Sequence, residues 1–167
     1  SHFCAAERQF RTPLSYGAVR TPTAQWTATA AGCCLLQPQG EGVGIAAATF
    51  GRVQDYQVKD INNMGAAMAP AAASTLLHYF ADTHTEPQEF DCIYTGDLGQ
   101  VGSSLLRELL AAEGLLVKNH VDCGCILFDA AEQQVKSGGS GPGCCAAVLC
   151  GHILPRLLRR SQKRVLF

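Results

Sequence analysis

Two glycine-rich turns offer the clearest chemistry in this sequence. The first is Thr95-Gly96-Asp97-Leu98-Gly99 and the second is Gly138-Gly139-Ser140-Gly141. Each follows a short apolar segment and precedes a stretch with helical apolar spacing, which predicts that each turn leads from a strand into a helix. Small residues let a backbone approach a ligand closely, and a helix N-terminus presents unpaired N–H groups. If the two turns converge, their N–H groups would form a site for a small anion.

Groups that could catalyse a reaction are present only in part. Ser140 lies between glycines, but Gly139-Ser140-Gly141 lacks the frame of the Gly-x-Ser-x-Gly nucleophile elbow. Cys144 and Cys145 lie near an expected helix N-terminus, where a thiolate is stabilised, but a base would have to come from elsewhere in space. The Lys-Ser/Thr pair that ends a Walker motif is missing. These residues favour a ligand-binding domain over an enzyme.

Two aspartates and the cysteines raise the question of a metal site. Asp97 and Asp122 each lie near a glycine turn, and we expect Asp97 to cap the helix after its turn by accepting N–H bonds. The nine cysteines include no Cys-x-x-Cys spacing and, without a secretory signal, are expected to be reduced. Cys123 and Cys125 would share one face of a strand, but no second pair completes a zinc set. We therefore expect no metal ion and no cofactor.

Composition limits the class of protein. The 167 residues are 47% hydrophobic and 16% charged, which is typical of a core-rich globular domain or a part of one. A net charge of −1 gives no reason to expect nucleic acid as a partner. No apolar run reaches the roughly 18 residues of a membrane-spanning helix. The first residue is not Met and the last three are apolar, so we expect a piece of a longer protein.

The elements that would position the turns alternate between strand and helix. This pattern predicts an α/β fold, a sheet with helices packed on it. Pro70 is compatible with its helix only if the regular part starts near residue 69, and Pro155 should kink or end the last helix. The expected strands are 24–36 and 43–53, paired as an antiparallel hairpin, then 90–94, 121–128 and 165–167; the expected helices are 64–82, 103–112 and 144–158.

Six motifs, in this order along nearly the whole chain, together resemble the stage V sporulation protein AD family (SpoVAD). They are Ala6-Glu7-Arg8-Gln9-Phe10-Arg11-Thr12-Pro13, Thr23-Ala24-Gln25-Trp26-Thr27, Asn63-Met64-Gly65-Ala66-Ala67-Met68-Ala69-Pro70-Ala71-Ala72, Thr95-Gly96-Asp97-Leu98-Gly99, Asp122-Cys123-Gly124 and Gly138-Gly139-Ser140-Gly141.

The resemblance implies a thiolase-like fold with two similar halves and a mixed sheet. Residues 1–63 would end the first half, and residues 64–167 would form most of the second. The family belongs to the SpoVA assembly, which moves dipicolinic acid, with calcium, into the developing spore and releases it at germination. The resemblance therefore implies dipicolinic acid as ligand, other SpoVA proteins as partners, and a peripheral place at the forespore or spore inner membrane inside the sporulating cell. A homodimer is also compatible with it.

The resemblance further implies a protein without catalytic residues. Where thiolase-like enzymes carry His or Asn, the first turn holds Asp97 and the second holds neither residue type. Pro142 departs from the family pattern. Because proline has no backbone N–H group, this change would weaken ligand binding if the family uses that N–H group to contact a carboxylate. The alternatives are an acyltransferase of the ketoacyl synthase type and a scaffold subunit that contacts partners through Glu7–Arg11 and Arg156–Arg164. The expected ligand-binding residues are Thr95, Gly96, Asp97, Gly99, Asp122, Cys123, Gly138, Gly139, Ser140 and Gly141.

Overall fold

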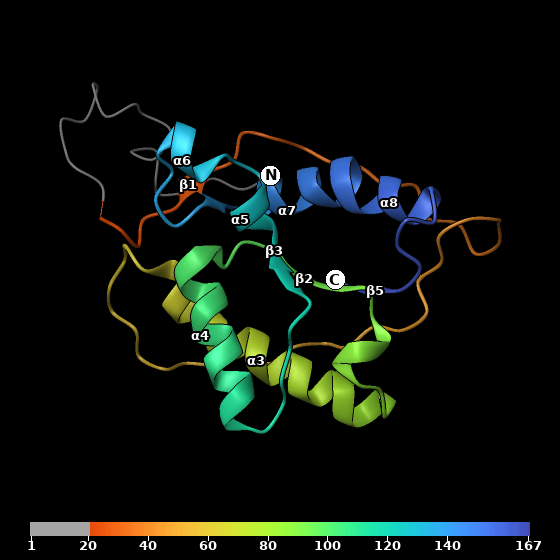
Figure 1. Ribbon diagram of the computed structural model, residues 1–167, viewed down its shortest axis with the longest axis horizontal. Helices are drawn as coiled ribbons and strands as arrows, with labels where there is room; N and C mark the ends of the chain where they lie inside the picture. Colours follow the sequence, from red (N-terminus) through yellow and green to blue (C-terminus); the bar gives the residue numbers. More distant parts are fainter. Residues whose placement is uncertain (1–20) are drawn as a thin grey trace.

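A parallel three-stranded sheet lies at the centre of the structure, a computed structural model that describes residues 21–167 (Figure 1). Its strands are β2 (Cys92–Thr95), β3 (His120–Asp122) and β5 (Val165–Leu166), in the order β3–β2–β5. A second parallel pair joins β1 (Trp26–Thr27) to β4 (Gly139–Ser140). The expected α/β class is confirmed, whereas the thiolase-like assignment and the division after residue 63 stay predictions.

The side chains of β2 alternate between two cores, as the pleat of a strand requires. Ile93 packs into a core with the helices α3 (Met64–Thr83) and α4 (Gly99–Ala112). Cys92 and Tyr94 pack into a second core that includes the last helical region. Figure 1 shows α3 and α4 on one side of β2 and the last helices on the other. The central strand is therefore covered on both faces.

The helices α3 and α4 touch through glycine. A Cβ atom on Gly65 would lie 2.5 Å from the carbonyl oxygen of Leu98, and one on Gly102 would lie 2.8 Å from the Cα of Gly65. Helix α3 begins at Met64, where the Asn63 side chain accepts a hydrogen bond from the N–H group of Ala66 at 3.1 Å.

Pro70 is inside α3 and buried, so the expectation that the regular helix starts near residue 69 is wrong. An interior proline costs about 3 kcal/mol. The Asn63 cap and the close contact with α4 hold the first turns helical despite this cost.

The expected hairpin of strands 24–36 and 43–53 does not form. Within these segments only the two residues of β1 are in a strand, and residues 28–60 contain neither helix nor strand. Their large apolar side chains are exposed, with Phe50 at 97% and Val53 at 98%. A strand needs a neighbouring strand for its N–H and C=O groups, and residues 21–167 supply only the parallel β4. Both sheets in this part of the chain are parallel, which corrects the expected mixed sheet.

The expected strand 121–128 is wrong after its second residue. The chain turns from β3 directly into the short helix α5 (Cys123–Ile126), because the Asp122 side chain caps it by accepting from the N–H group of Gly124 at 2.9 Å. A second short helix, α6 (Ala130–Gln133), follows α5. Cys123 and Cys125 therefore do not share the face of a strand.

The last helical region confirms the effect expected of Pro155. It consists of α7 (Pro142–Val148), a π-helical turn η2 (Leu149–Ile153) and α8 (Leu154–Leu158), with Pro155 in the first turn of α8. The wider π turn interrupts the regular hydrogen bonds just before the proline.

The remaining local features agree with the sequence or lie beyond the described part. Gly114 follows α4 with a φ of +80°, the left-handed conformation that glycine often adopts just after a helix. A short 3₁₀ turn, η1 (Pro87–Glu89), leads into β2. No helix of residues 21–167 combines the length and apolarity needed to cross a membrane. The expected contact segment Glu7–Arg11 lies outside the described residues.

The glycine contact between α3 and α4 can be tested by adding one methyl group. We expect Gly65→Ala to lower the free energy of unfolding by about 2 kcal/mol, because the new Cβ would overlap backbone atoms of α4 that cannot move independently. Urea unfolding of the purified protein measures this change. Gly151→Ala is the matched control, since its Cβ would meet nothing within 4 Å. Equal stabilities of the two variants would contradict the proposed packing.

Candidate functional site

The two glycine turns, whose convergence the sequence left open, meet in the structure. The N–H group of Gly141 donates to the Asp97 carboxylate at 2.6 Å, which links the second turn to the first. The Gln25 amide donates both to the carbonyl of Asp97 at 2.6 Å and to that of Gly139 at 2.9 Å. The N–H group of Gln100 donates to the carbonyl of Ser137 at 2.7 Å. Residues far apart in the sequence thus form one hydrogen-bonded structure around the turns.

The carboxylate of Asp122 lies at the centre of this structure and is only 2% exposed. One oxygen accepts from the Thr95 hydroxyl at 2.6 Å and from the N–H group of Leu98 at 2.9 Å. The other accepts from the N–H groups of Gly99 and Gly124, both at 2.9 Å. Burial raises the pKa of Asp122, and these four donors act against that shift by stabilising the ionised form. Asp122 therefore fills the anion site at the N-terminus of α4 from within the protein.

This geometry corrects two expectations about the turns. Asp97 does not cap α4, because its carboxylate faces the second turn and the cap position is taken by Leu98. The backbone N–H groups expected to bind an external anion are partly occupied, since those of Leu98 and Gly99 are bonded to Asp122 and that of Gly141 is bonded to Asp97. Any ligand must use other groups of the turns.

Pro142 does not remove a needed donor. It is the first residue of α7, where a backbone N–H group has no helical partner. The contact to a carboxylate is made one residue earlier, by Gly141.

The expected ligand-binding residues divide into a buried floor and a half-buried rim. The floor consists of Gly99, Asp122, Cys123, Gly138 and Gly139. The rim consists of Thr95, Gly96, Asp97, Ser140 and Gly141. Cys145, which was not among the expected ligand-binding residues, also lies at the rim, because a Cβ on Gly96 would be 3.5 Å from its sulfur. Only the rim can touch a ligand without rearrangement.

The thiols near the turns are not activated. Burial raises the pKa of Cys144 to about 12 and that of Cys125 to about 11, and it also raises the pKa of Cys123 and Cys145. The negative charges of Asp97 and Asp122 act in the same direction on Cys144. The helix N-terminus was expected to favour a thiolate, but these internal carboxylates offset it.

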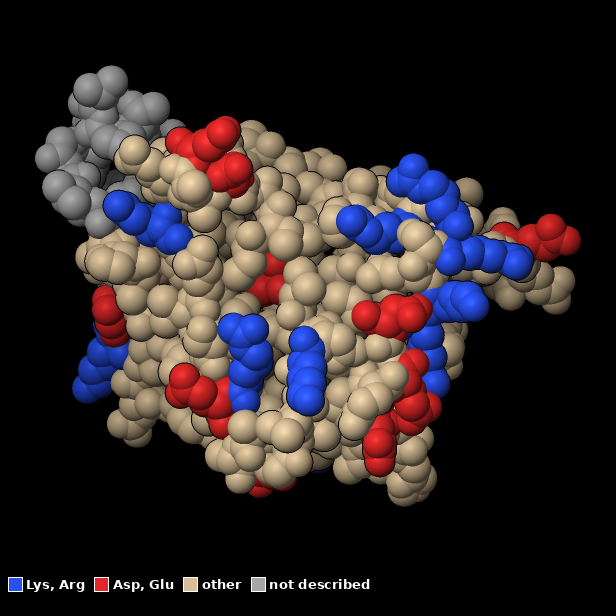
Figure 2. Space-filling model, viewed as in Figure 1, with Lys and Arg blue, Asp and Glu red and all other residues tan. Residues whose placement is uncertain are grey.

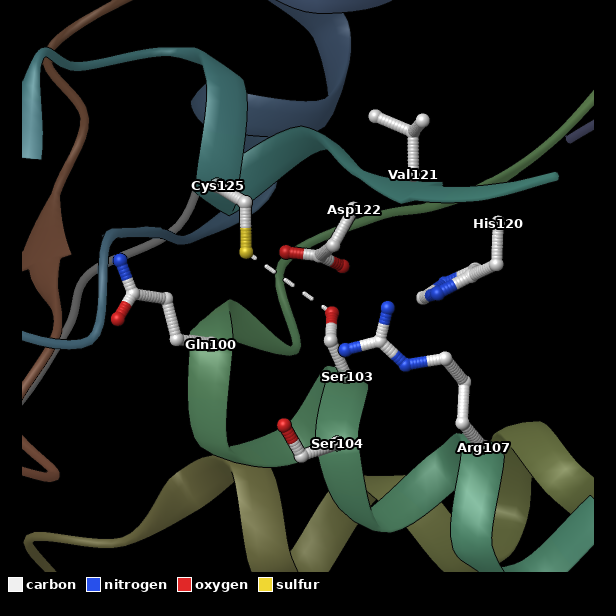
Figure 3. A pocket seen from close by; sticks show the side chains of 8 residues that line it. All are labelled: Gln100, Ser103, Ser104, Arg107, His120, Val121, Asp122 and Cys125. Carbon is white, nitrogen blue, oxygen red and sulfur yellow. Dashed lines mark hydrogen bonds between the residues drawn. The ribbon is translucent and has the colours of Figure 1, made fainter. Parts of the chain in front are cut away.

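A cavity of about 290 Å³ opens beside the buried carboxylate (Figure 3). Of the residues expected in a site, only Asp122 lines it. His120 lies on β3 and is 8% exposed. Burial and the nearby charge of Arg107 lower the pKa of His120 to about 4, so its ring is neutral at pH 7. The lining residues are Gln100, Ser103, Ser104, Arg107, His120, Val121, Asp122 and Cys125.

The described part of the chain gathers no metal site. Within residues 21–167, no group of three or more His, Cys, Asp or Glu side chains lies close enough together to hold a metal ion.

The role of Asp122 can be tested by removing its charge. We expect Asp122→Asn to lower the free energy of unfolding by about 2–4 kcal/mol, because the amide nitrogen would face donors that need an acceptor. Chemical unfolding followed by circular dichroism measures the change.

Asp129→Asn is the matched control for this substitution. Asp129 caps α6 at an exposed position by accepting from the N–H groups of Ala131 and Glu132, and asparagine serves equally well as a cap. A similar loss in both variants would mean that Asp122 acts only as a helix cap.

Comparison with known proteins assigns the chain to a family. The model of the family "Stage V sporulation protein AD (SpoVAD)" matches residues 1–167. The chain is also 40% identical over 166 residues to "Stage V sporulation protein AD" of Bacillus subtilis (strain 168). This match covers 99% of the chain and 49% of the relative, so the chain spans about half the length of that protein. The chain belongs to the stage V sporulation protein AD family.

Proposed function

We propose that the protein containing this chain binds dipicolinic acid as its calcium complex and does not transform it. It would act as a subunit of the SpoVA transport assembly at the inner membrane of the forespore and spore, during spore formation and germination. Membership of a sporulation family supports the setting. The observation that carries the ligand assignment is the carboxylate of Asp97 on the half-buried rim.

Asp97 is the only rim residue with a charge, and its carboxylate retains binding capacity. One oxygen accepts from Gly141, and the hydrogen bonds of the described residues leave the other oxygen unoccupied. A free dicarboxylate would be repelled by this charge, whereas a bound calcium ion would be attracted to it. Carboxylate oxygens are the ligands that calcium prefers. The rim therefore favours the calcium complex over the free acid.

The small residues of the rim suit a flat ligand. Gly96 and Gly141 present backbone without side chains, and the hydroxyls of Thr95 and Ser140 stand beside them. The Thr95 hydroxyl gives its proton to Asp122 and so offers only a lone pair. Ser140 is the rim hydroxyl that can donate to a carboxylate of the ligand.

The thiols support binding without chemistry. An acyltransferase of the thiolase class needs a thiolate nucleophile and a base beside it. Burial raises the pKa of Cys144 and Cys145, and the negative charges of Asp97 and Asp122 act in the same direction.

Calorimetric titration tests the proposed ligand. Dipicolinate should bind the intact protein saturably and about tenfold more tightly with calcium than without it. Asp97→Asn should abolish that calcium dependence, because the amide keeps the contact with Gly141 but loses the charge. Gly96→Leu should block binding by filling the rim at a backbone position that is not strained.

Gly151→Leu serves as the control, because Gly151 lies in an open position on η2. If Gly96→Leu still binds dipicolinate, the ligand does not bind at the rim. If the intact protein shows no saturable binding, the scaffold role is favoured.

Thiol reactivity tests the alternative of an acyltransferase. We expect Cys144 and Cys145 to react with iodoacetamide at pH 7.5 more slowly than glutathione does, because their raised pKa leaves little thiolate. Mass spectrometry of peptides after timed quenching gives the rate for each cysteine. A rate above that of glutathione would reopen the enzyme hypothesis.

A further inference from the structure

His120 carries a hydrogen-bonding atom that the described residues do not satisfy. Its Nδ1 atom is buried and has no partner, although the side chain lines the cavity beside Asp122. Unpaired buried polar atoms are uncommon and costly in native proteins. This cost suggests that the atom has a partner when the protein works.

The neighbouring hydrogen bonds fix which proton the ring carries. The Thr95 hydroxyl donates to Asp122 at 2.6 Å, so its single proton is committed. The Nε2 atom of His120 lies 2.8 Å from the same hydroxyl oxygen and must be the donor in that contact. A neutral ring with its proton on Nε2 leaves Nδ1 with a lone pair. The missing partner is therefore a hydrogen-bond donor.

The same cavity contains a positive charge. Arg107 rises from α4, and its guanidinium group points toward the His120 ring and the Asp122 carboxylate (Figure 3). Arg107 has no hydrogen bond or ion pair with another residue in the range 21–167. Figure 2 shows basic side chains beside a recessed acidic group near the middle of this face. The charge of Asp122 is already shared among four donors, which leaves the guanidinium free to bind an anion.

We propose that this cavity is a second ligand site, which takes a small oxyanion bearing its own hydrogen-bond donor. The anionic oxygens bind Arg107 and the Ser104 hydroxyl, and the donor of the ligand binds Nδ1 of His120. Hydrogen phosphate has this chemistry, and so does a carboxylate with an adjacent hydroxyl group. Dipicolinate at neutral pH has two ionised carboxylates and no donor, so it does not fit, and this site is separate from the rim.

Equilibrium dialysis with phosphate and sulfate tests the proposal on the intact protein. The two ions have the same shape, but at neutral pH only phosphate carries an O–H group. We expect phosphate to bind about tenfold more tightly than sulfate, because sulfate leaves Nδ1 unpaired. Equal binding of the two ions, or no binding of phosphate, would overturn the proposal.

Two variants separate the charge from the acceptor. Arg107→Gln should abolish binding of both ions, whereas Lys118→Gln removes a nearby exposed charge outside the cavity lining and should change little. His120→Gln can still donate to Thr95 from the position of Nε2 but lacks the acceptor at Nδ1. It should therefore keep sulfate binding and lose the preference for phosphate. A preference that survives in His120→Gln would contradict the assigned role of the ring.

Competition identifies the source of the anion and tests the separation from the rim. Displacement of labelled phosphate by glycolate but not by acetate would indicate a hydroxy-carboxylate ligand. If neither displaces it, the ligand is a phosphate. Dipicolinate should not displace phosphate, and its own binding should be unchanged in Arg107→Gln. Displacement by dipicolinate would overturn the assignment of a separate site, and absence of dipicolinate binding at the rim would leave this site unaffected.

Discussion

The buried carboxylate of Asp122 is the interaction on which the site depends. It binds the hydroxyl of Thr95 at the end of β2, the first N–H groups of α4 and the N–H group of Gly124 in α5. A charge that is 2% exposed is tolerated only when its oxygens are fully paired. The same bonds therefore stabilise the ion and fix the positions of three elements.

Internal carboxylates also change the chemistry expected of the glycine turns. Helix N-termini attract anions, and two of them near each other would attract a dianion. Here Asp122 occupies the first, and Asp97 is bonded to Gly141 just before the second. Burial raises the pKa of Cys144, and these charges act in the same direction. This arrangement supports the proposal that the ligand brings a cation and that the thiols do not act as nucleophiles.

The neutral ring of His120 extends this network into the cavity that Arg107 also lines. Because the proton of Thr95 is committed to Asp122, the orientation of every donor in the chain from Asp122 to His120 is determined. The Asp122 carboxylate thus determines that Nδ1, on the opposite side of the His120 ring, is a hydrogen-bond acceptor. The ionised Asp122 in this way determines the hydrogen-bonding polarity of the cavity beside Arg107.

The sequence by itself determined the elements whose signals are local. Such signals depend on residues within a few positions of each other. They include the apolar spacing of α3 and α4, the short strands β2 and β5, the two glycine turns and the interruption by Pro155. The tertiary structure alone decided which backbone N–H groups each carboxylate contacts. Asp122 and Leu98 are 24 positions apart, and Asp97 and Gly141 are 44 apart, so no local pattern could show that these carboxylates occupy the turns. The expected strands 24–36 and 43–53 do not form, for a related reason. A strand needs a neighbouring strand to pair with, and local propensity does not show whether the fold provides one.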